Sequence, residues 1–301
     1  MAVDVSVIIV NYKTKHLVKD CICSVRKHTS GMSYEIIVVD NASEDISDLR
    51  ADDVQLLQLE KNVGFGRANN AGVKLASGNA LFFLNPDTVL MNNAVGILYN
   101  ALTSIPDCGV CGANLYDANN NPAHSYFYCT MSLRHAFRCL SKSAGRIHHI
   151  SNQHNFDESI KSVDYITGAD LMINRCLFDD IGGFNNGIFM YYEDVDLCSK
   201  VRRRHKKCYS VPQARIQHLE GQSFKPSQND HDAIIGRKMK MSGDSIAVFL
   251  RSNYKKTHYN AILFANILIL RLKLLAYKAI AKKQPGARQQ LVFFKYIKGK
   301  L

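Results

Sequence analysis

Three carboxylates fall within four positions of the segment FMYYEDVDLC, residues 189–198, directly behind an aromatic and apolar run. Acids are common in a first helical turn, because they face unpaired N–H groups and the positive end of the helix dipole. A carboxylate in that position also stays ionised, as a general base must. The segment alone favours helix capping over catalysis. Side chains at i and i+2 point to different sides of a helix, so Asp194 and Asp196 cannot share a role, and a structural or capping role is expected of Asp196.

A further acid, Asp87, ends the stretch ALFFLNPD, residues 80–87. Asn-Pro commonly begins a turn, and Asp87 can simply cap the next element of the chain. A carboxylate at the carboxyl edge of a sheet can instead hold a hard divalent cation that bridges two phosphates. His218, in QHLEG, is interpreted as a core histidine unless it meets Asp87. Together the two side chains would leave positions on a manganese-like ion for pyrophosphate oxygens.

The loop GFGRAN, residues 64–69, is close to the GxGxxG pattern of dinucleotide-binding proteins. Two features argue against that interpretation: Asn69 replaces the third glycine, and the loop follows the third strand rather than the first. The glycines can equally serve the turn into a helix. Backbone N–H groups at such a helix start favour phosphate oxygens, so a binding role at the strand ends stays open.

The cysteines are typical of structural thiols. Nine are scattered without a disulfide-like spacing, which indicates reduced thiols in a cytosolic protein. Cys108 and Cys111 form a CxxC, but the sequence lacks a second pair at zinc-site spacing. The N-terminal run VSVIIV is short and β-branched and has no charged region before it, so we expect a first buried strand and not a signal peptide.

Apolar runs bounded by polar residues alternate with stretches of helical spacing through the first part of the chain. The runs cover residues 5–10, 35–40, 54–60 and 80–87, and a helical pattern covers 15–28. This alternation predicts an α/β fold with a doubly wound, mostly parallel central sheet flanked by helices. Ligands of such sheets bind outside the carboxyl ends of the strands. The polar residues at these ends are Asn11, Asp40, Asn41 and Asp87.

The middle of the chain is less regular. Residues 115–160 are rich in Asn and His and show no clean period, which predicts a long irregular excursion on the acceptor side of the site. Regular structure returns over 163–174, and a helix begins within the acidic segment 189–198. Residues 206–221 are expected to form a pair of strands that ends near His218.

The C-terminal part, residues 226–301, is predicted to be a basic helical extension. The chain has a formal net charge of +12, and Lys and Arg dominate from residue 236 onward, which suggests an anionic partner. The longest apolar run of this part has about ten residues, against the roughly 20 needed to span a bilayer. A basic amphipathic helix lying in a membrane interface fits this pattern. A helix packed on the domain with its lysines in water is the alternative.

Seven segments occur in one order along the chain: VSVIIVNYKT, EIIVVDNAS, NVGFGRANNAG, LFFLNPDT, TGADLMINR, GGFNNGIFMYYEDVDLCSKVRR and HLEGQSF. Together they resemble the family 2 glycosyltransferases of the rhamnosyltransferase-like bacterial group. The resemblance covers roughly residues 4–224. It implies that residues 1–225 form a nucleotide-sugar glycosyltransferase domain of the GT-A type, and it does not extend into the C-terminal part.

The resemblance also implies an inverting transfer that depends on Mn²⁺ or Mg²⁺. Asp87 occupies the place of the family's Asp-x-Asp and would hold the metal with His218. Asp194 matches the catalytic base, with Glu193 beside it. Asn85 stands where an Asp is usual, which removes one charge. The residues that would contact the nucleotide sugar are Val10, Asn11, Tyr12, Asp40, Asn41, Gly64, Gly66, Asn69, Asn85 and Asp87, and those expected on the acceptor side are Gly168, Ala169 and Asp170.

The leading hypothesis is transfer of L-rhamnose from dTDP-rhamnose to a polyprenyl-diphosphate-linked glycan, in the synthesis of a surface polysaccharide such as O-antigen or capsule. The basic extension would hold a cytoplasmic enzyme on the inner face of the cytoplasmic membrane. A UDP-hexose donor, UDP-galactose or UDP-glucose, is the alternative within this class.

Three alternatives lie outside it. An NAD-dependent oxidoreductase is suggested by the glycine loop. A catalytically silent nucleotide- or glycan-binding module is disfavoured because both Asp87 and Asp194 are present. A nucleic-acid binder ranks last, because no basic stripe with interleaved aromatic residues accompanies the predicted sheet.

Overall fold

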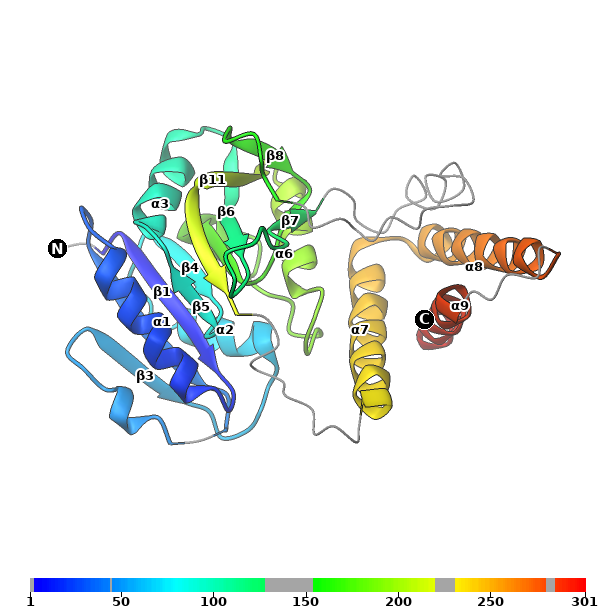
Figure 1. Ribbon diagram of the computed structural model, residues 1–301, viewed down its shortest axis with the longest axis horizontal. Helices are drawn as coiled ribbons and strands as arrows, with labels where there is room; N and C mark the ends of the chain where they lie inside the picture. Colours follow the sequence, from blue (N-terminus) through cyan, green and yellow to red (C-terminus); the bar gives the residue numbers. More distant parts are fainter. Residues whose placement is uncertain (1–2, 44, 128–153, 220–230, 280–284) are drawn as a thin grey trace. The chain divides into compact units, whose positions relative to one another are not determined.

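The structure is a computed structural model that describes residues 3–43, 45–127, 154–219, 231–279 and 285–301. The described residues fall into two compact units (Figure 1). The first holds the residues up to 127, 154–189 and 193–219; the second holds 190–192 and the residues from 231 onward. Residues 128–153 of the predicted excursion, and the HLEGQSF motif from residue 220 on, lie outside the described residues.

A nine-stranded sheet forms the centre of the first unit, as far as that unit is described. Its strands lie in the order β3 (Val54–Gln58), β2 (Tyr34–Asp40), β1 (Val5–Asn11), β4 (Ala80–Leu84), β10 (Asp170–Asn174), β6 (Cys108–Tyr116), β11 (Lys207–His218) and β5 (Thr88–Leu90), with β8 (Lys161–Val163) paired to β11. A separate small sheet pairs β7 (Tyr126–Phe127) with β9 (Tyr165–Ile166).

The central sheet is mixed. Strands β3, β2, β1 and β4 run parallel, as the alternation of the sequence predicts. Strand β10 enters antiparallel between β4 and β6, and β11 runs parallel to β6. Every residue of β1 and β4 is buried, because both faces of the sheet are covered. This double burial is the reason why these strands appear in the sequence as uninterrupted apolar runs.

Helices cover both faces of the sheet (Figure 1). One face carries α1 (Lys15–His28) and α3 (Ala94–Ser104), and the other carries α2 (Phe65–Val73), α5 (Arg175–Asp180) and α6 (Glu193–Arg203). Side chains of β1 alternate between the two cores: Val7 and Ile9 join the first, and Ile8 and Val10 the second. A short 3-10 helix, η1 (Ser47–Leu49), lies between β2 and β3. The predicted α/β sheet with flanking helices is confirmed.

The prediction of two strands over residues 206–221 is wrong. A single strand, β11, covers most of this stretch and ends at His218, with a shift in register between Val211 and Arg215. Pro212 lies within that shift and has no N–H to donate, so it interrupts the pairing without ending the strand. In the sequence the same interruption is indistinguishable from a turn, which explains the error.

The second unit consists of helices packed on each other, together with residues 190–192. Its helices are α7 (His231–Asn253), α8 (Lys256–Ala279) and α9 (Pro285–Lys300). Gly243 of α7 lies against the ring of Tyr296 of α9, where an added Cβ would come within 2.8 Å of Cδ1. The Tyr296 hydroxyl donates to Asp244 Oδ1 at 2.8 Å. None of the helices in the described part of the chain is long and apolar enough to cross a membrane.

Candidate active site

The ends of β1 and β2 form a rigid polar corner at the carboxyl edge of the sheet. Asn11 and Asp40 pair in register, and both side chains are fully buried. Asn11 Nδ2 donates to Asp40 Oδ1 at 2.8 Å, and Ser43 donates to the same carboxylate through its N–H, at 2.9 Å, and its hydroxyl, at 2.5 Å. Val10 lies in the core, whereas the neighbouring Tyr12 is 41% exposed. The corner is thus held in one arrangement, and Tyr12 is the exposed ring next to it.

The glycine loop begins with backbone amides that are already engaged. Asn41 Oδ1 accepts from the Val63 N–H at 2.9 Å, and Asn62 Oδ1 accepts from the Gly64 N–H at 3.0 Å. Asn41 Nδ2 in turn donates to Asn62 Oδ1 at 3.0 Å. Because these two N–H groups bond within the protein, they are not the phosphate ligands that a helix start can provide.

Glycine is required at position 64. Gly64 has φ +90°, and an added Cβ would lie 2.2 Å from the Phe189 carbonyl oxygen, which accepts from the Phe65 N–H at 3.0 Å. A Cβ on Gly66 would lie 3.6 Å from the Cβ of the first residue of α6. Asn69 is 1% exposed and donates to the Phe65 carbonyl at 3.2 Å, so its side chain lies inside the protein. The loop therefore brings its backbone close to the start of α6.

Asn85, Asp87 and His218 come together beyond the end of β4. His218 Nε2 lies 3.3 Å from Asp87 Oδ1, and Asn85 Nδ2 lies 3.5 Å from the same ring nitrogen. The side chains of Asp87 and His218 are 6% and 11% exposed. The Leu219 N–H donates to the Asp87 carbonyl at 2.8 Å, which fixes the two segments to each other.

This set of donors fits a divalent cation of the manganese type. A carboxylate oxygen and an imidazole nitrogen are ligands that Mn²⁺ accepts. No group of three His, Cys, Asp or Glu side chains that could hold a metal gathers within the described ranges. Asp87 and His218 would therefore bind the ion with open positions, which oxygens of a diphosphate would fill.

Residues 168 and 169 link the metal-binding candidates to the acids of α6. The Gly168 N–H donates to Asp194 Oδ2 at 3.0 Å, and the Ala169 carbonyl accepts from the Asn85 N–H at 2.9 Å. A Cβ on Gly168 would lie 3.6 Å from Asp194 Cβ. Two adjacent residues, Gly168 and Ala169, thus connect Asn85 with Asp194, which are far apart in the sequence.

The acid pair at the start of α6 is asymmetric. Glu193 is buried, and its Oε2 has no hydrogen-bond partner within the described residues. Asp194 is partly exposed and accepts from the Gly168 N–H at Oδ2 and from the Val195 N–H, at 2.7 Å, at Oδ1. Burial and the neighbouring Asp194 charge raise the pKa of Glu193 to about 8. Burial also raises the pKa of Asp194, against the two N–H donors, which favour its ionised form.

The raised pKa of Glu193 favours a single proton on the pair near neutral pH. We assign that proton to Glu193 and the charge to Asp194, because only Asp194 has two N–H groups directed at its oxygens. An ionised and partly exposed carboxylate is the form that a general base needs.

Two other acids named from the sequence are structural. Asp196 is fully buried, and its Oδ2 lies 3.3 Å from Lys200 Nζ one helical turn later. Asp170, expected on the acceptor side, is fully buried in β10 and accepts from the Ala113 N–H. Burial raises the pKa of Asp170 well above its usual range. Its carboxyl lies within the sheet, so the expectation that Asp170 faces the acceptor does not fit its position.

The sequence interpretation missed two residues that shape the site. Ser43 supplies two of the donors to Asp40, and Asn62 links the Asn41 side chain to the Gly64 N–H. Both are small polar residues a few positions from the polar strand ends, and that proximity was the available signal.

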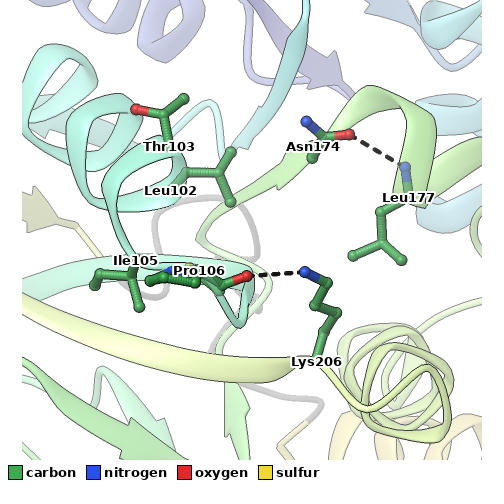
Figure 2. Close-up of a pocket in the computed structure, with 8 residues that line it drawn as sticks. Leu102, Thr103, Ile105, Pro106, Asn174, Leu177 and Lys206 are labelled. Carbon is green, nitrogen blue, oxygen red and sulfur yellow. Dashed lines mark hydrogen bonds between the residues drawn. The ribbon is translucent and has the colours of Figure 1, made fainter.

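A cavity of about 410 Å³ lies away from this site. Figure 2 shows side chains that line it, with Lys206 Nζ donating to the Pro106 carbonyl at 2.9 Å and the Leu177 N–H donating to Asn174 Oδ1 at 3.3 Å. Asn174 pairs with Ala80 at the start of β4, so the cavity is at the opposite edge of the sheet. It contains none of the predicted site residues.

The family of the chain follows from a comparison of sequences. Residues 6–161 match the profile described as Glycosyl transferase family 2. The chain belongs to this family. The predicted membership is thereby confirmed.

Curated relatives carry names of the same kind. The low-salt glycan biosynthesis hexosyltransferase Agl10 of Haloferax volcanii is 27% identical over 210 residues, which cover 67% of this chain and 62% of the relative. The glycosyltransferase GlyG of Streptococcus pneumoniae is 27% identical, over 61% of this chain and 60% of the relative. The N-acetylglucosaminyl-diphospho-decaprenol L-rhamnosyltransferase of Mycobacterium tuberculosis is 25% identical, over 62% and 67%. The chain thus spans about three fifths of the length of the first two relatives.

Solved structures with a similar fold are also glycosyltransferases. The mannosyltransferase PcManGT of Pyrobaculum calidifontis, in complex with GDP-Man and Mn²⁺, has a TM-score of 0.57 at 16% identity and covers 100% of this chain and 86% of that one. GalNAc-T7 with UDP, GalNAc and Mn²⁺ has a TM-score of 0.56 at 17% identity and covers 83% and 48%. At these identities the likeness concerns the fold, and it confirms the predicted GT-A type.

Proposed function

We propose that the protein is an inverting, metal-dependent glycosyltransferase that moves L-rhamnose from dTDP-rhamnose to a polyprenyl-diphosphate-linked glycan. One observation carries the enzymatic part of this proposal. The segment 168–169 joins Asp194 to Asn85 at the carboxyl edge of the sheet, so that a candidate base and a candidate diphosphate site share one location. An inverting transfer requires these two groups on opposite sides of the reacting carbon.

Asp194 would act on the acceptor. Its carboxylate removes the proton of the attacking hydroxyl as the bond to the sugar forms. The N–H groups of Gly168 and Val195 orient this carboxylate, and protonated Glu193 adds no second negative charge beside it.

The donor side would be formed by Asp87, His218 and Asn85. Asp87 and His218 would hold Mn²⁺ or Mg²⁺, which when bound supplies a Lewis acid for the charge of the departing diphosphate. Asn85, 3.5 Å from His218, would contact the sugar or ribose. The polar corner of Asn11 and Asp40 would support the base and ribose of the nucleotide.

The choice of donor rests on the relatives. The mycobacterial protein is named an L-rhamnosyltransferase, and the Haloferax protein a hexosyltransferase. Rhamnose is the leading proposal, in agreement with the sequence motifs, and a UDP-hexose such as UDP-galactose or UDP-glucose is the second candidate.

The acceptor and the location rest on the C-terminal helices and on the decaprenol in the name of the mycobacterial relative. On α8, three apolar side chains recur at intervals of four residues and are exposed: Phe264, Leu268 and Leu272, at 61%, 44% and 52%. Arg271 is exposed beside them, in a chain with a net charge of +12. An apolar stripe next to basic residues fits the interface of an anionic membrane. We therefore propose a cytoplasmic enzyme, peripheral on the inner face of the membrane, in surface polysaccharide synthesis.

The test is a donor panel. The full chain is incubated with Mn²⁺ or Mg²⁺, a short polyprenyl-diphosphate-linked acceptor and, in turn, dTDP-rhamnose, UDP-galactose, UDP-glucose and GDP-mannose. Release of nucleotide from dTDP-rhamnose alone is the expected result. Turnover with a UDP-hexose alone would show that the proposed donor sugar is wrong and that the proposed reaction, glycosyl transfer, is right. Absence of turnover with every donor and metal would overturn the proposal in favour of a silent binding module.

A further inference from the structure

Three residues, Met190–Tyr192, connect two parts of the candidate site. Before them, the Phe189 carbonyl accepts from the Phe65 N–H at 3.0 Å, at the glycine loop. After them, Glu193 begins α6. The conformation of this short link therefore determines how the acid pair enters its helix.

The link has an unfavourable backbone conformation. Tyr191 and Tyr192 have φ +67° and +68°, both in the left-handed region. Residues with a Cβ seldom adopt this region, because the Cβ approaches the following carbonyl oxygen. Two such residues in succession persist only where the surroundings hold them.

Helix α7 holds the link, through contacts that lie within the second unit. Ser245 is 3% exposed, and its hydroxyl donates to the Met190 carbonyl at 2.7 Å. The ring of Phe249, fully buried, lies 5.8 Å from the ring of Tyr192. Lys238 Nζ lies 5.5 Å from the centroid of the Tyr191 ring.

These contacts come from one side of the helix. Lys238, Ser245 and Phe249 are separated by seven and four residues, which is the spacing of a single face. The face engages all three residues of the link, one side chain to each. Because each residue of the link has its own contact on α7, we interpret this face of the helix as a specific binding surface for the segment.

We propose that α7 is a positioning element for catalysis: it holds Met190–Tyr192 in the left-handed conformation and so sets the orientation of Glu193 and Asp194. Ser245 and Phe249 are positioning residues, since neither belongs to the acid pair. The inference rests on the proposed role of Asp194 as the base. It gives the C-terminal extension a function in the reaction itself, besides the attachment proposed above. A small displacement of a base lowers the rate of transfer much more than it lowers substrate binding.

The first test removes one hydrogen bond. Ser245→Ala leaves the packing volume nearly unchanged and takes away the donor to the Met190 carbonyl. We expect kcat to fall about fivefold to tenfold with the KM for the nucleotide sugar and the melting temperature unchanged. Ser252→Ala, an exposed position of the same helix, is the matched control and should behave as wild type. The assay uses the donor that gives turnover in the panel and a water-soluble acceptor, so that membrane attachment plays no part.

A double-mutant cycle tests the contact between the rings. If Phe249 acts through Tyr192, then Phe249→Ala and Tyr192→Ala each lower kcat, and the double variant is no worse than the poorer single one. Tyr192→Phe keeps the ring and should retain wild-type kcat. Additive losses in the cycle would overturn the proposed route through Tyr192.

Hydrogen exchange supplies a readout that needs no substrate. In the full chain, the peptide covering residues 189–198 should exchange faster in Ser245→Ala than in wild type or Ser252→Ala. Unchanged exchange together with unchanged kcat would overturn the inference. Asp194→Asn distinguishes the proposed base from the proposed positioning role of α7. If Asp194→Asn is inactive while Ser245→Ala and Phe249→Ala are fully active, only the positioning role is wrong. If Asp194→Asn is fully active, the proposed base fails.

Discussion

The two ends of the candidate site satisfy their polar groups in opposite ways. At the polar corner, the buried Asp40 carboxylate receives hydrogen bonds from Asn11 and from two groups of Ser43. At the start of α6, Glu193 Oε2 is buried with no hydrogen-bond partner in the described part of the chain. Burial and the neighbouring Asp194 charge raise the pKa of Glu193 to about 8.

The difference indicates a division of labour within one sheet edge. A satisfied network is rigid and suits the binding of a nucleotide, whose shape does not change in the reaction. An acid pair that shares one proton is energetically unfavourable and suits the transfer of a proton. We therefore expect substitutions in the corner to affect stability and binding, and substitutions in the pair to affect rate.

Removal of Asp87, the proposed metal ligand, should have the largest effect on transfer. Asp87→Ala leaves His218 as the remaining side-chain ligand, so transfer should fall by about 10³-fold, and added EDTA should have little further effect. Wild type, by comparison, should lose activity in EDTA and regain it with Mn²⁺. The measurement is nucleotide release at several Mn²⁺ concentrations. Wild-type turnover in EDTA would show that Asp87 does not serve a metal.

Substitution of Asp40 in the polar corner should lower the stability of the fold. Asp40→Ala removes the carboxylate that accepts from the buried Asn11 amide and from the partly buried Ser43 N–H and hydroxyl, which should lower the free energy of unfolding by about 3 kcal/mol. Urea denaturation followed by circular dichroism measures this. Asp52→Ala, an exposed acid in the connection between β2 and β3, is the control and should change stability little. If Asp40→Ala were as stable as the control variant, the hydrogen bonds of the polar corner would not stabilise the fold, and the proposed contrast with the acid pair would be wrong.

Substitution of Gly64 in the glycine loop should have a smaller effect on stability. Gly64→Ala places a Cβ 2.2 Å from the Phe189 carbonyl oxygen at φ +90°, so stability should fall by about 2 kcal/mol. Gly31→Ala is the control for the backbone conformation alone: it also has a positive φ, +76°, but nothing lies within 4 Å of the added Cβ. Gly31→Ala should therefore cost about 1 kcal/mol, and an equal loss in both would contradict the close contact.

The contribution of Glu193 to stability should depend on pH. Because the folded protein retains the Glu193 proton up to a pKa of about 8, while the unfolded chain releases it near its ordinary value, stability should fall as pH rises between the two. Glu193→Gln cannot release a proton and should remove most of this fall, on the order of a few kcal/mol. Denaturation at pH 5 and pH 8.5 measures the effect. An identical pH dependence in wild type and Glu193→Gln would show that Glu193 ionises at an ordinary pKa.

The polar corner and the acids of α6 could largely be predicted from the sequence. The runs at 5–10 and 35–40 are buried on both faces and are nearly all apolar, and their polar ends lie next to each other because parallel strands end at one edge. The acids of α6 were found because a helix start is recognisable from its charges.

The remainder depends on contacts between distant segments. The antiparallel entry of β10 brings residues 168–169 between Asn85 and Asp194, and nothing local in TGADLMIN specifies that neighbourhood. Asp170 was expected on the acceptor side, yet it is fully buried inside the sheet, where its carboxyl accepts from the Ala113 N–H. Likewise, the left-handed Tyr191 and Tyr192 are held by a helix some fifty residues later in the chain.

One comparison of variants tests the division between binding and chemistry most directly. Asp40→Asn and Asp194→Asn are each titrated with the nucleotide sugar of the active donor by calorimetry, and each is assayed for single-turnover transfer at saturating donor. Asp40→Asn should weaken donor binding about tenfold and leave the rate at saturation within a few-fold of wild type. Asp194→Asn should bind donor as wild type does and transfer about 10³-fold more slowly. A loss of donor affinity in Asp194→Asn, with a rate at saturation near that of wild type, would contradict this division between binding and chemistry.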